Sequence, residues 1–132
     1  MKTDKGYIQS AKIAYATYYY SINNYKDSFK ISKNAYTKSF DCDRIENALT
    51  LRTRQSGDFI HINQEGQTKT LKKFFVDEKI PLSIRDSIPL VAMDNCILWV
   101  VGYRINPIFE AAPASKKIFV VELTKEEVNG NN

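Results

Sequence analysis

The sequence predicts an α+β fold, namely a small β-rich domain with a mixed or antiparallel sheet and one main helix. Short segments with alternating apolar and polar residues recur along the chain, which is typical of half-buried strands. Apolar residues at helical spacing stand out in residues 69–79. Regular β-α-β alternation is absent, so a purely parallel sheet is not expected. With 132 residues, 43% of them hydrophobic, the chain is predicted to be a single domain over residues 1–132.

Residues 1–39 are predicted to be tyrosine-rich N-terminal strands. Residues 7–25 combine Tyr, Ile and Thr, which favour strands over helices. Tyrosine rings can stack on nucleobases, but in strands they more often pack against their neighbours, and we prefer that interpretation. A second strand is expected near residues 34–41.

A third strand is expected at residues 48–54 and a fourth at residues 59–63. In the third strand, alternation would place Leu49 and Leu51 on one face, opposite Arg52 and Arg54. The two strands are separated by a turn at residues 55–58.

The main helix is predicted over residues 69–79. Leu71, Phe74 and Phe75 fall at positions i, i+3 and i+4, so they form one apolar stripe. Either Thr68 or Thr70 can cap the N-terminus. The lysines of this segment would then lie on the opposite side, in water: Lys69, Lys72 and Lys73.

Prolines delimit the segments that follow. Pro81 is expected to end the helix, because the residue before a proline avoids the α region. Ser83 could cap a short helical turn that Pro89 ends. Residues 90–93 and 97–103 then flank Asp94-Asn95, a hairpin signature whose second arm is apolar enough to be a buried central strand. A last strand is expected at residues 118–123, before a frayed tail over residues 124–132.

Catalytic chemistry is not evident in this sequence. It contains no phosphate-binding loop motif, and a single histidine with two scattered cysteines cannot form a zinc site. Cys96 and His61 could form a nucleophilic pair, but Cys96 begins an apolar strand, so we favour an inert thiol. Two carboxylates could pair as acid and base, but nothing in the sequence fixes their distance; the candidates are Asp58, Asp77, Glu78 and Asp86. For Asp86 we prefer a role in orienting Arg85 or capping a neighbouring turn. The chain by itself is therefore not expected to be an enzyme or to bind a cofactor or metal.

A cytoplasmic location is expected. No apolar run approaches the ~20 residues of a membrane-spanning helix. The sequence shows no apolar signal segment after Met1, and Cys42 and Cys96 lie far apart in unrelated contexts, as free thiols of a reducing compartment do.

The distribution of cations suggests a negatively charged partner. The net charge of +4 permits a nucleic acid without requiring one. Lysines suit phosphate contacts, and arginines suit bidentate contacts to a phosphate or a guanine edge. The alternative is that the lysines are a solvated face and that Arg85 and Arg104 make internal salt bridges. The candidate RNA-binding residues are Arg52, Arg54, Lys69, Lys72, Lys73, Arg85 and Arg104.

Four motifs occur in a specific order. They are R-x-R-x-x-G-D from Arg52, K-x-L-K-x-F-F from Lys69, K-I-P-x-x-x-R-D from Lys79, and G-Y-R from Gly102. In this combination, residues 40–123 resemble the C-terminal domain of bacterial tRNA(Ile)-lysidine synthetase. One departure is Phe59, which stands where many members of that family carry an arginine.

The resemblance implies both a fold and a function. The fold would be similar to a domain of the phenylalanyl-tRNA synthetase β subunit. The full enzyme would use ATP, with Mg, to activate the wobble cytidine of isoleucine tRNA for ligation to lysine. That chemistry would belong to a catalytic N-terminal domain of the same chain, which this sequence lacks. The present domain would bind the acceptor stem, with Gly57 and Gly66 allowing tight turns beside it. The alternative function is a protein-interaction or dimerisation module without direct RNA contact.

Overall fold

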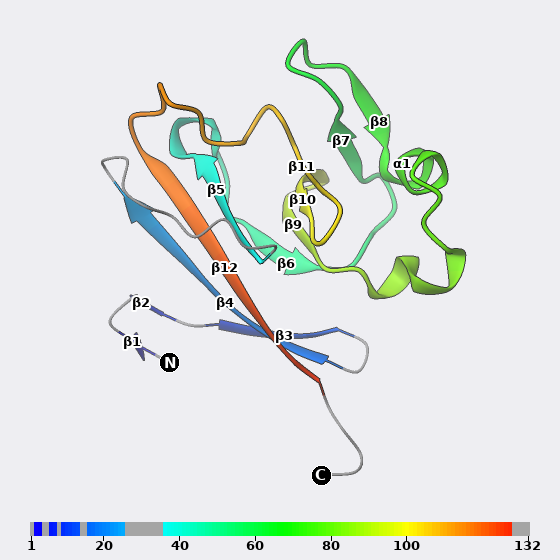
Figure 1. Cartoon of the computed structure of the whole chain (residues 1–132), viewed down its shortest axis with the longest axis horizontal. Helices are drawn as coiled ribbons and strands as arrows, with labels where there is room; N and C mark the ends of the chain where they lie inside the picture. The colour runs from blue at the N-terminus through cyan, green and yellow to red at the C-terminus, as the bar shows by residue number, and fades with distance from the viewer. Residues whose placement is uncertain (1, 4–5, 8, 14–15, 26–35, 128–132) are drawn as a thin grey trace. The chain divides into compact units, whose positions relative to one another are not determined.

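The computed structural model describes residues 2–3, 6–7, 9–13, 16–25 and 36–127 (Figure 1). Side chains are described from residue 36 to residue 124, except that of Phe119. The chain divides into two compact units. The first consists of residues 1–43 together with 111–132, and the second of residues 44–110. The prediction of a single domain over residues 1–132 is not decided by this division and stays a prediction.

The first unit contains a four-stranded antiparallel sheet in the order β3-β4-β12-β5. Its strands are β3 (Gln9–Ile13), β4 (Ala16–Tyr25), β5 (Thr37–Asp41) and β12 (Ile118–Glu127). Two short strands, β1 (Lys2–Thr3) and β2 (Gly6–Tyr7), pair with each other. The predicted strands in residues 7–25 and near 34–41 are therefore confirmed where the chain is described. The packing predicted for the tyrosines of residues 7–25 concerns side chains that lie outside the described residues.

The prediction of a frayed tail over residues 124–132 is wrong for residues 124–127, which belong to a strand. β12 continues to Glu127, which pairs with Ala16 of β4. The ten-residue ladder with β4 supplies backbone partners that the local sequence does not reveal. Val120, Val121 and Leu123 of β12 are buried. Residues 128–132 lie outside the described part of the chain.

The second unit contains a mixed six-stranded sheet in the order β6-β9-β10-β7-β8, with β11 also paired to β10. The strands are β6 (Thr50–Arg52), β7 (Phe59–His61), β8 (Thr68–Thr70), β9 (Leu90–Met93), β10 (Cys96–Val100) and β11 (Arg104–Ile105). β10 pairs with β7 in parallel, and the other ladders are antiparallel. This sheet and a single α-helix among the described residues confirm the predicted α+β class.

The predicted hairpin and central strand are also confirmed. β9 and β10 pair across Asp94-Asn95, and Asp94 has a φ of 54°, in the left-handed region that Asp tolerates. Every residue of β10 is buried, including Trp99 at 1% exposure.

The helix α1 (Leu71–Asp77) is shorter than predicted at both ends. Thr70 is its N-cap, and the Thr70 hydroxyl accepts a hydrogen bond from the Lys73 amide. Lys69 therefore lies in β8 rather than on the helix, as β8 pairs with β7 up to the cap. Leu71, Phe74 and Phe75 are buried, as their spacing predicts.

Backbone geometry, not Pro81, ends α1. Lys79 adopts a φ of 57°, and its amide donates to the Val76 carbonyl. The next amide, of Ile80, donates to the Phe75 carbonyl at 3.0 Å, which completes a Schellman motif. Ile80 and Phe75 are both buried, so the motif carries the apolar contact that commonly accompanies it.

Two short 3₁₀ helices complete the described elements: η1 (Cys42–Arg44) and η2 (Leu82–Ser87). The prediction that Ser83 caps the second of these is wrong. Pro81 occupies the N-cap position, and no side-chain cap hydrogen bond is made there. No helix in the described part of the chain is long and apolar enough to span a membrane.

Candidate functional site

Arg52 and Asp58 form a buried ion pair between β6 and the loop that leads into β7. The Arg52 Nη1 and Nη2 atoms donate to the two Asp58 carboxylate oxygens at 2.9 and 2.8 Å. Nη1 and Nη2 also donate to the carbonyls of Thr53 and Asp94. The side chains of Arg52 and Asp58 are 13% and 0% exposed. Arg52 therefore holds the loop, and little of its guanidinium is left for a ligand.

Asp58 is the centre of this network. It also accepts hydrogen bonds from the Gln55 amide at 2.8 Å and from Asn95 Nδ2 at 3.0 Å. Burial by itself raises the pKa of Asp58, but these hydrogen bonds and the charge of Arg52 together hold its pKa below the usual value. The carboxylate is thus a structural anion, and the acid–base role weighed from the sequence has no support in this geometry.

Two of the candidate lysines share one carboxylate on α1. Lys69 Nζ lies 2.7 Å from Asp77 Oδ2, and Lys73 Nζ lies 2.9 Å from Asp77 Oδ1. The two ammonium groups lower the pKa of Asp77. The Lys73 side chain is nevertheless 64% exposed, so this i,i+4 pair leaves it accessible.

Two candidate arginines stack on the same aromatic ring of α1. The guanidinium carbons of Arg54 and Arg85 lie 5.7 and 6.0 Å from the centre of the Phe75 ring. Arg54 Nε donates to Asp86 Oδ1 at 2.7 Å, whereas Arg85 Nε donates to the Ile80 carbonyl at 2.9 Å. The prediction that Asp86 orients Arg85 is therefore wrong. Asp86 orients Arg54 instead, from a position that is remote in sequence.

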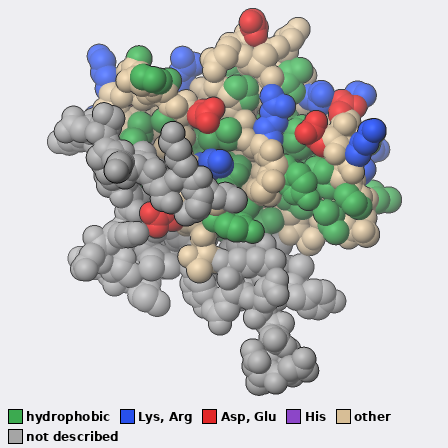
Figure 2. Space-filling view, viewed as in Figure 1, with side chains coloured by type: hydrophobic (Ala, Val, Ile, Leu, Met, Phe, Trp, Pro, Cys, Tyr) green, Lys and Arg blue, Asp and Glu red, His purple; other side chains and the backbone are tan. Residues whose placement is uncertain are grey.

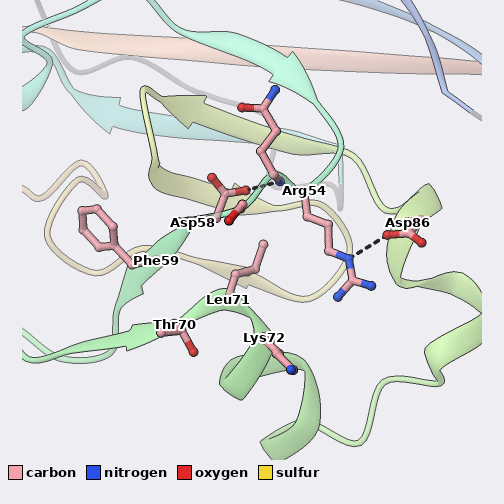
Figure 3. Close-up of a pocket in the computed structure, with 10 residues that line it drawn as sticks. Arg54, Asp58, Phe59, Thr70, Leu71, Lys72 and Asp86 are labelled. Carbon is pink, nitrogen blue, oxygen red and sulfur yellow. Dashed lines mark hydrogen bonds and ion pairs between the residues drawn. The ribbon is translucent and has the colours of Figure 1, made fainter.

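Lys72 differs from the other candidates because it makes no hydrogen bond or ion pair with any described residue. It is exposed, and it lines a pocket of about 600 Å³. Arg54 and Asp86 also line this pocket, as does the loop Gln55–Phe59 together with Thr70 and Leu71. Figure 3 shows the Arg54 guanidinium lying between Asp86 and the helix that carries Lys72.

Arg104 lies apart from these residues. It belongs to β11, and its Nη2 donates to the Ile62 carbonyl at 2.9 Å. The structure thus divides the seven candidates. Five are tied to α1 and are called here the α1 cation cluster: Arg54, Lys69, Lys72, Lys73 and Arg85. Figure 2 shows Lys and Arg side chains interspersed with Asp and Glu side chains on the second unit, rather than a uniformly positive area.

Sequence reasoning missed the residues that shape the pocket. Gln55 and Ser56 lie in a segment that the sequence identified only as a turn. Gly57 has a φ of 90° and Gly66 a φ of 88°, so the tight turns expected at both glycines are confirmed. Gly57-Asp58, which ends the R-x-R-x-x-G-D motif, is the sequence feature that could have identified this loop.

Cys96 and His61 do lie near each other, with 3.9 Å between Sγ and Nδ1. His61 Nδ1 also accepts a hydrogen bond from Nδ2 of the buried Asn106, at 3.1 Å. Burial lowers the pKa of His61 and raises the pKa of the Cys96 thiol to about 11. The thiol therefore stays protonated near neutral pH, which favours the inert interpretation. No cluster of three or more metal-ligating side chains occurs among the residues described.

Comparisons with known proteins agree on one family. The family model for the TilS substrate C-terminal domain matches residues 49–123. A tRNA(Ile)-lysidine synthase of Caldanaerobacter subterraneus subsp. tengcongensis is 46% identical over 96 residues, which are 72% of this chain and 20% of that protein. The enzyme of the same name from Clostridium tetani is 37% identical over 100 residues, 75% of this chain and 21% of that protein. The chain thus spans about a fifth of the length of these relatives.

A structural comparison gives the same result. A solved crystal structure of a TilS C-terminal domain superposes with a TM-score of 0.62 and 27% sequence identity, covering 86% of each chain. The expected likeness to a domain of the phenylalanyl-tRNA synthetase β subunit is a separate matter and stays a prediction.

Proposed function

The chain belongs to the TilS substrate C-terminal domain family, and from this premise we propose that it binds the acceptor stem of isoleucine tRNA for a tRNA(Ile)-lysidine synthase. In this proposal a separate N-terminal domain uses ATP, Mg and lysine to modify the wobble cytidine. The present domain supplies affinity and alignment, and no step of the chemistry.

The observation that carries the proposal is the α1 cation cluster. A stem of A-form RNA is recognised through its phosphates, its 2′-hydroxyls and its shape, since its deep groove is closed to side chains. Contacts from cations to the phosphates fix the register and orientation of the protein on such a stem. Arg54 and Arg85 are fixed by the Phe75 ring, whereas Lys72 and Lys73 extend from exposed positions of the same helix.

The members of the cluster differ in what they can offer. Lys72 and Lys73 are exposed and would act as phosphate contacts, with Lys69 as a less accessible third. Arg54 and Arg85 would add bidentate contacts. In this proposal Arg104 contributes a separate contact from β11. Arg52 contributes indirectly, by holding the loop that precedes β7.

The proposal is tested by measuring the binding of an isoleucine-tRNA acceptor minihelix by fluorescence anisotropy at several salt concentrations. Affinity should fall as salt rises, because each neutralised phosphate releases counterions. Changing Lys72 and Lys73 together to alanine should weaken binding. A matched control is Lys116 and Lys117 changed together to alanine, since these are also adjacent, exposed lysines but lie in the first unit.

Three results would contradict acceptor-stem binding. The first is affinity that does not respond to salt, and the second is no binding at micromolar protein. The third is an equal loss of affinity in the two double variants, which would indicate unspecific attraction to any lysine pair. The rival hypothesis of a dimerisation module predicts instead a mass that rises with protein concentration when no RNA is present.

A further inference from the structure

The pocket beside α1 combines two cations with a preformed loop. It is lined by the loop Gln55–Phe59, by the junction of β8 and α1, and by Asp86 of η2. Its volume of about 600 Å³ is within the range of small-ligand sites. Among its charged lining residues, Asp58 is already neutralised by Arg52. Arg54, Lys72 and Asp86 are left to determine what the pocket binds.

We propose that this pocket holds one phosphate group of an RNA strand, with Arg54 and Lys72 as its ligands and Asp86 as the residue that orients Arg54. The inference rests on the proposed function, because it takes the phosphate to belong to bound RNA. It goes further in assigning one phosphate to one pocket, and in separating the role of Lys72 from that of its neighbour Lys73.

Arg54 is positioned as a phosphate ligand before any ligand arrives. Its Nε is bound to Asp86 at 2.7 Å, and its guanidinium carbon lies 5.7 Å from the centre of the fully buried Phe75 ring. No described residue accepts a hydrogen bond from its Nη1 or Nη2. A guanidinium held in this way presents two unused donor nitrogens, and a phosphate offers oxygens at the spacing that such a fork can bridge.

Lys72 provides the second cation. The adjacent Lys73 is bound by Asp77 at 2.9 Å, but Lys72 has no acidic partner among the described residues. Its charge is therefore not compensated within the described part of the molecule. An ammonium on a flexible stem can follow a phosphate that Arg54 has already located.

The loop that forms one wall of the pocket is held in place from its buried side. The Asp58 carboxylate accepts a hydrogen bond from the Gln55 amide at 2.8 Å, and Asn95 Nδ2 donates to the Ser56 carbonyl at 3.3 Å. Gly57 takes a φ of 90°, and a Cβ at that position would lie 3.6 Å from Asn95 Nδ2. The wall is therefore preformed, so binding does not have to order it. The volume of the pocket also exceeds that of a single phosphate group, which leaves space for the attached sugar.

The experiment compares single variants in the minihelix binding assay, with the salt dependence of affinity as the readout. Lys72→Ala and Arg54→Gln should each make the slope of log affinity against log salt shallower, by at most about 0.7–0.9, because the two cations share a single phosphate. Lys73→Ala is the comparison, because it removes a phosphate contact that lies outside the pocket and whose charge Asp77 partly compensates. Its slope should change by less than half as much. Circular dichroism and Trp99 fluorescence verify that each variant is folded. Because Lys72 is exposed, Lys72→Ala is not expected to disturb the fold.

Neutralising Asp86 tests whether the phosphate lies beside this residue. Asp86→Asn retains an oxygen that can accept from Arg54 Nε, but it removes a negative charge beside the phosphate. Binding should tighten by about two- to fivefold, the size expected for one exposed charge pair. Glu78→Gln, which changes an exposed acid at the C-cap of α1 that does not line the pocket, should have less effect.

The outcomes separate the two proposals. If the unaltered domain does not bind the minihelix, the proposed function fails. If it binds with a negative salt slope that Lys72→Ala leaves unchanged while Lys73→Ala makes it shallower, the pocket assignment is overturned and the proposed function stands. If Asp86→Asn tightens binding no more than Glu78→Gln does, the placement of the phosphate beside Asp86 is overturned.

Discussion

Replacing Asp58 by alanine should destabilise the second unit more than any exposed charge change can. The substitution removes four hydrogen-bond acceptor contacts, two of them from Arg52, and leaves the 13% exposed Arg52 side chain without its counter-charge. Breaking a buried ion pair on one side costs about 3–5 kcal/mol. The free energy of unfolding of a domain is only about 5–15 kcal/mol, so this loss would be a large fraction of it.

Urea unfolding followed by the fluorescence of Trp99 measures this effect. Trp99 is the only tryptophan in the sequence, and it is 1% exposed within β10 of the second unit. The matched control is Asp86→Ala, which breaks a pair of the same type in which Asp86 is 82% exposed. That control should cost no more than about 1 kcal/mol. Equal costs for the two variants would refute the view that burial makes the Asp58 pair structurally essential.

The Asp58 carboxylate should also make the stability of the folded protein depend on pH. The pKa of Asp58 is below its usual value of 3.8 in the folded state, so its contribution is complete above pH 3.8. The contribution is lost as the pH falls through the lower, folded-state pKa, where protonation removes the anion. The unaltered protein should therefore lose stability more steeply below about pH 4 than Asp58→Ala does. Parallel pH profiles for the two proteins would contradict this assignment.

Two further predictions concern local geometry and reactivity. Lys79→Gly should stabilise the second unit by about 1 kcal/mol, because glycine adopts the φ of 57° without a Cβ clash; thermal unfolding measures this, and a lower midpoint would contradict it. Cys96, whose thiol has a pKa of about 11, should resist iodoacetamide in the native protein at pH 8. The less buried Cys42 serves as the comparison, and mass spectrometry that finds Cys96 labelled first would refute the inert interpretation.

Much of the fold could be predicted because the relevant signals are local. The spacing of Leu71, Phe74 and Phe75 identified the helix and its buried face, and Asp94-Asn95 identified the hairpin. The ends of elements were less accurate. β12 is longer than the strand predicted at residues 118–123, because pairing with β4 extends it. Pairing depends on two segments, so the local sequence pattern of one segment does not reveal it.

The candidate site was predicted as a set of residue types rather than as an arrangement. The sequence could not indicate that Asp86 would bind Arg54, since the two are 32 positions apart and a nearer arginine, Arg85, was available. Nor could it separate Lys72 from Lys73, which have the same chemistry at adjacent positions. The contact of Lys73 with Asp77 and the position of Lys72 at the pocket distinguish them.

The sequence by itself determined the family, the α+β class and the surplus of cations around one short helix, because motifs, apolar spacing and charge are properties of the chain order. The tertiary structure decided which cations are free to act. It neutralised Arg52 with a buried carboxylate and fixed Arg54 on Phe75, and it left Lys72 without an acidic partner among the described residues. The physical reason is that the availability of a charge depends on which opposite charges and ring faces lie within a few ångströms, and folding alone sets those distances.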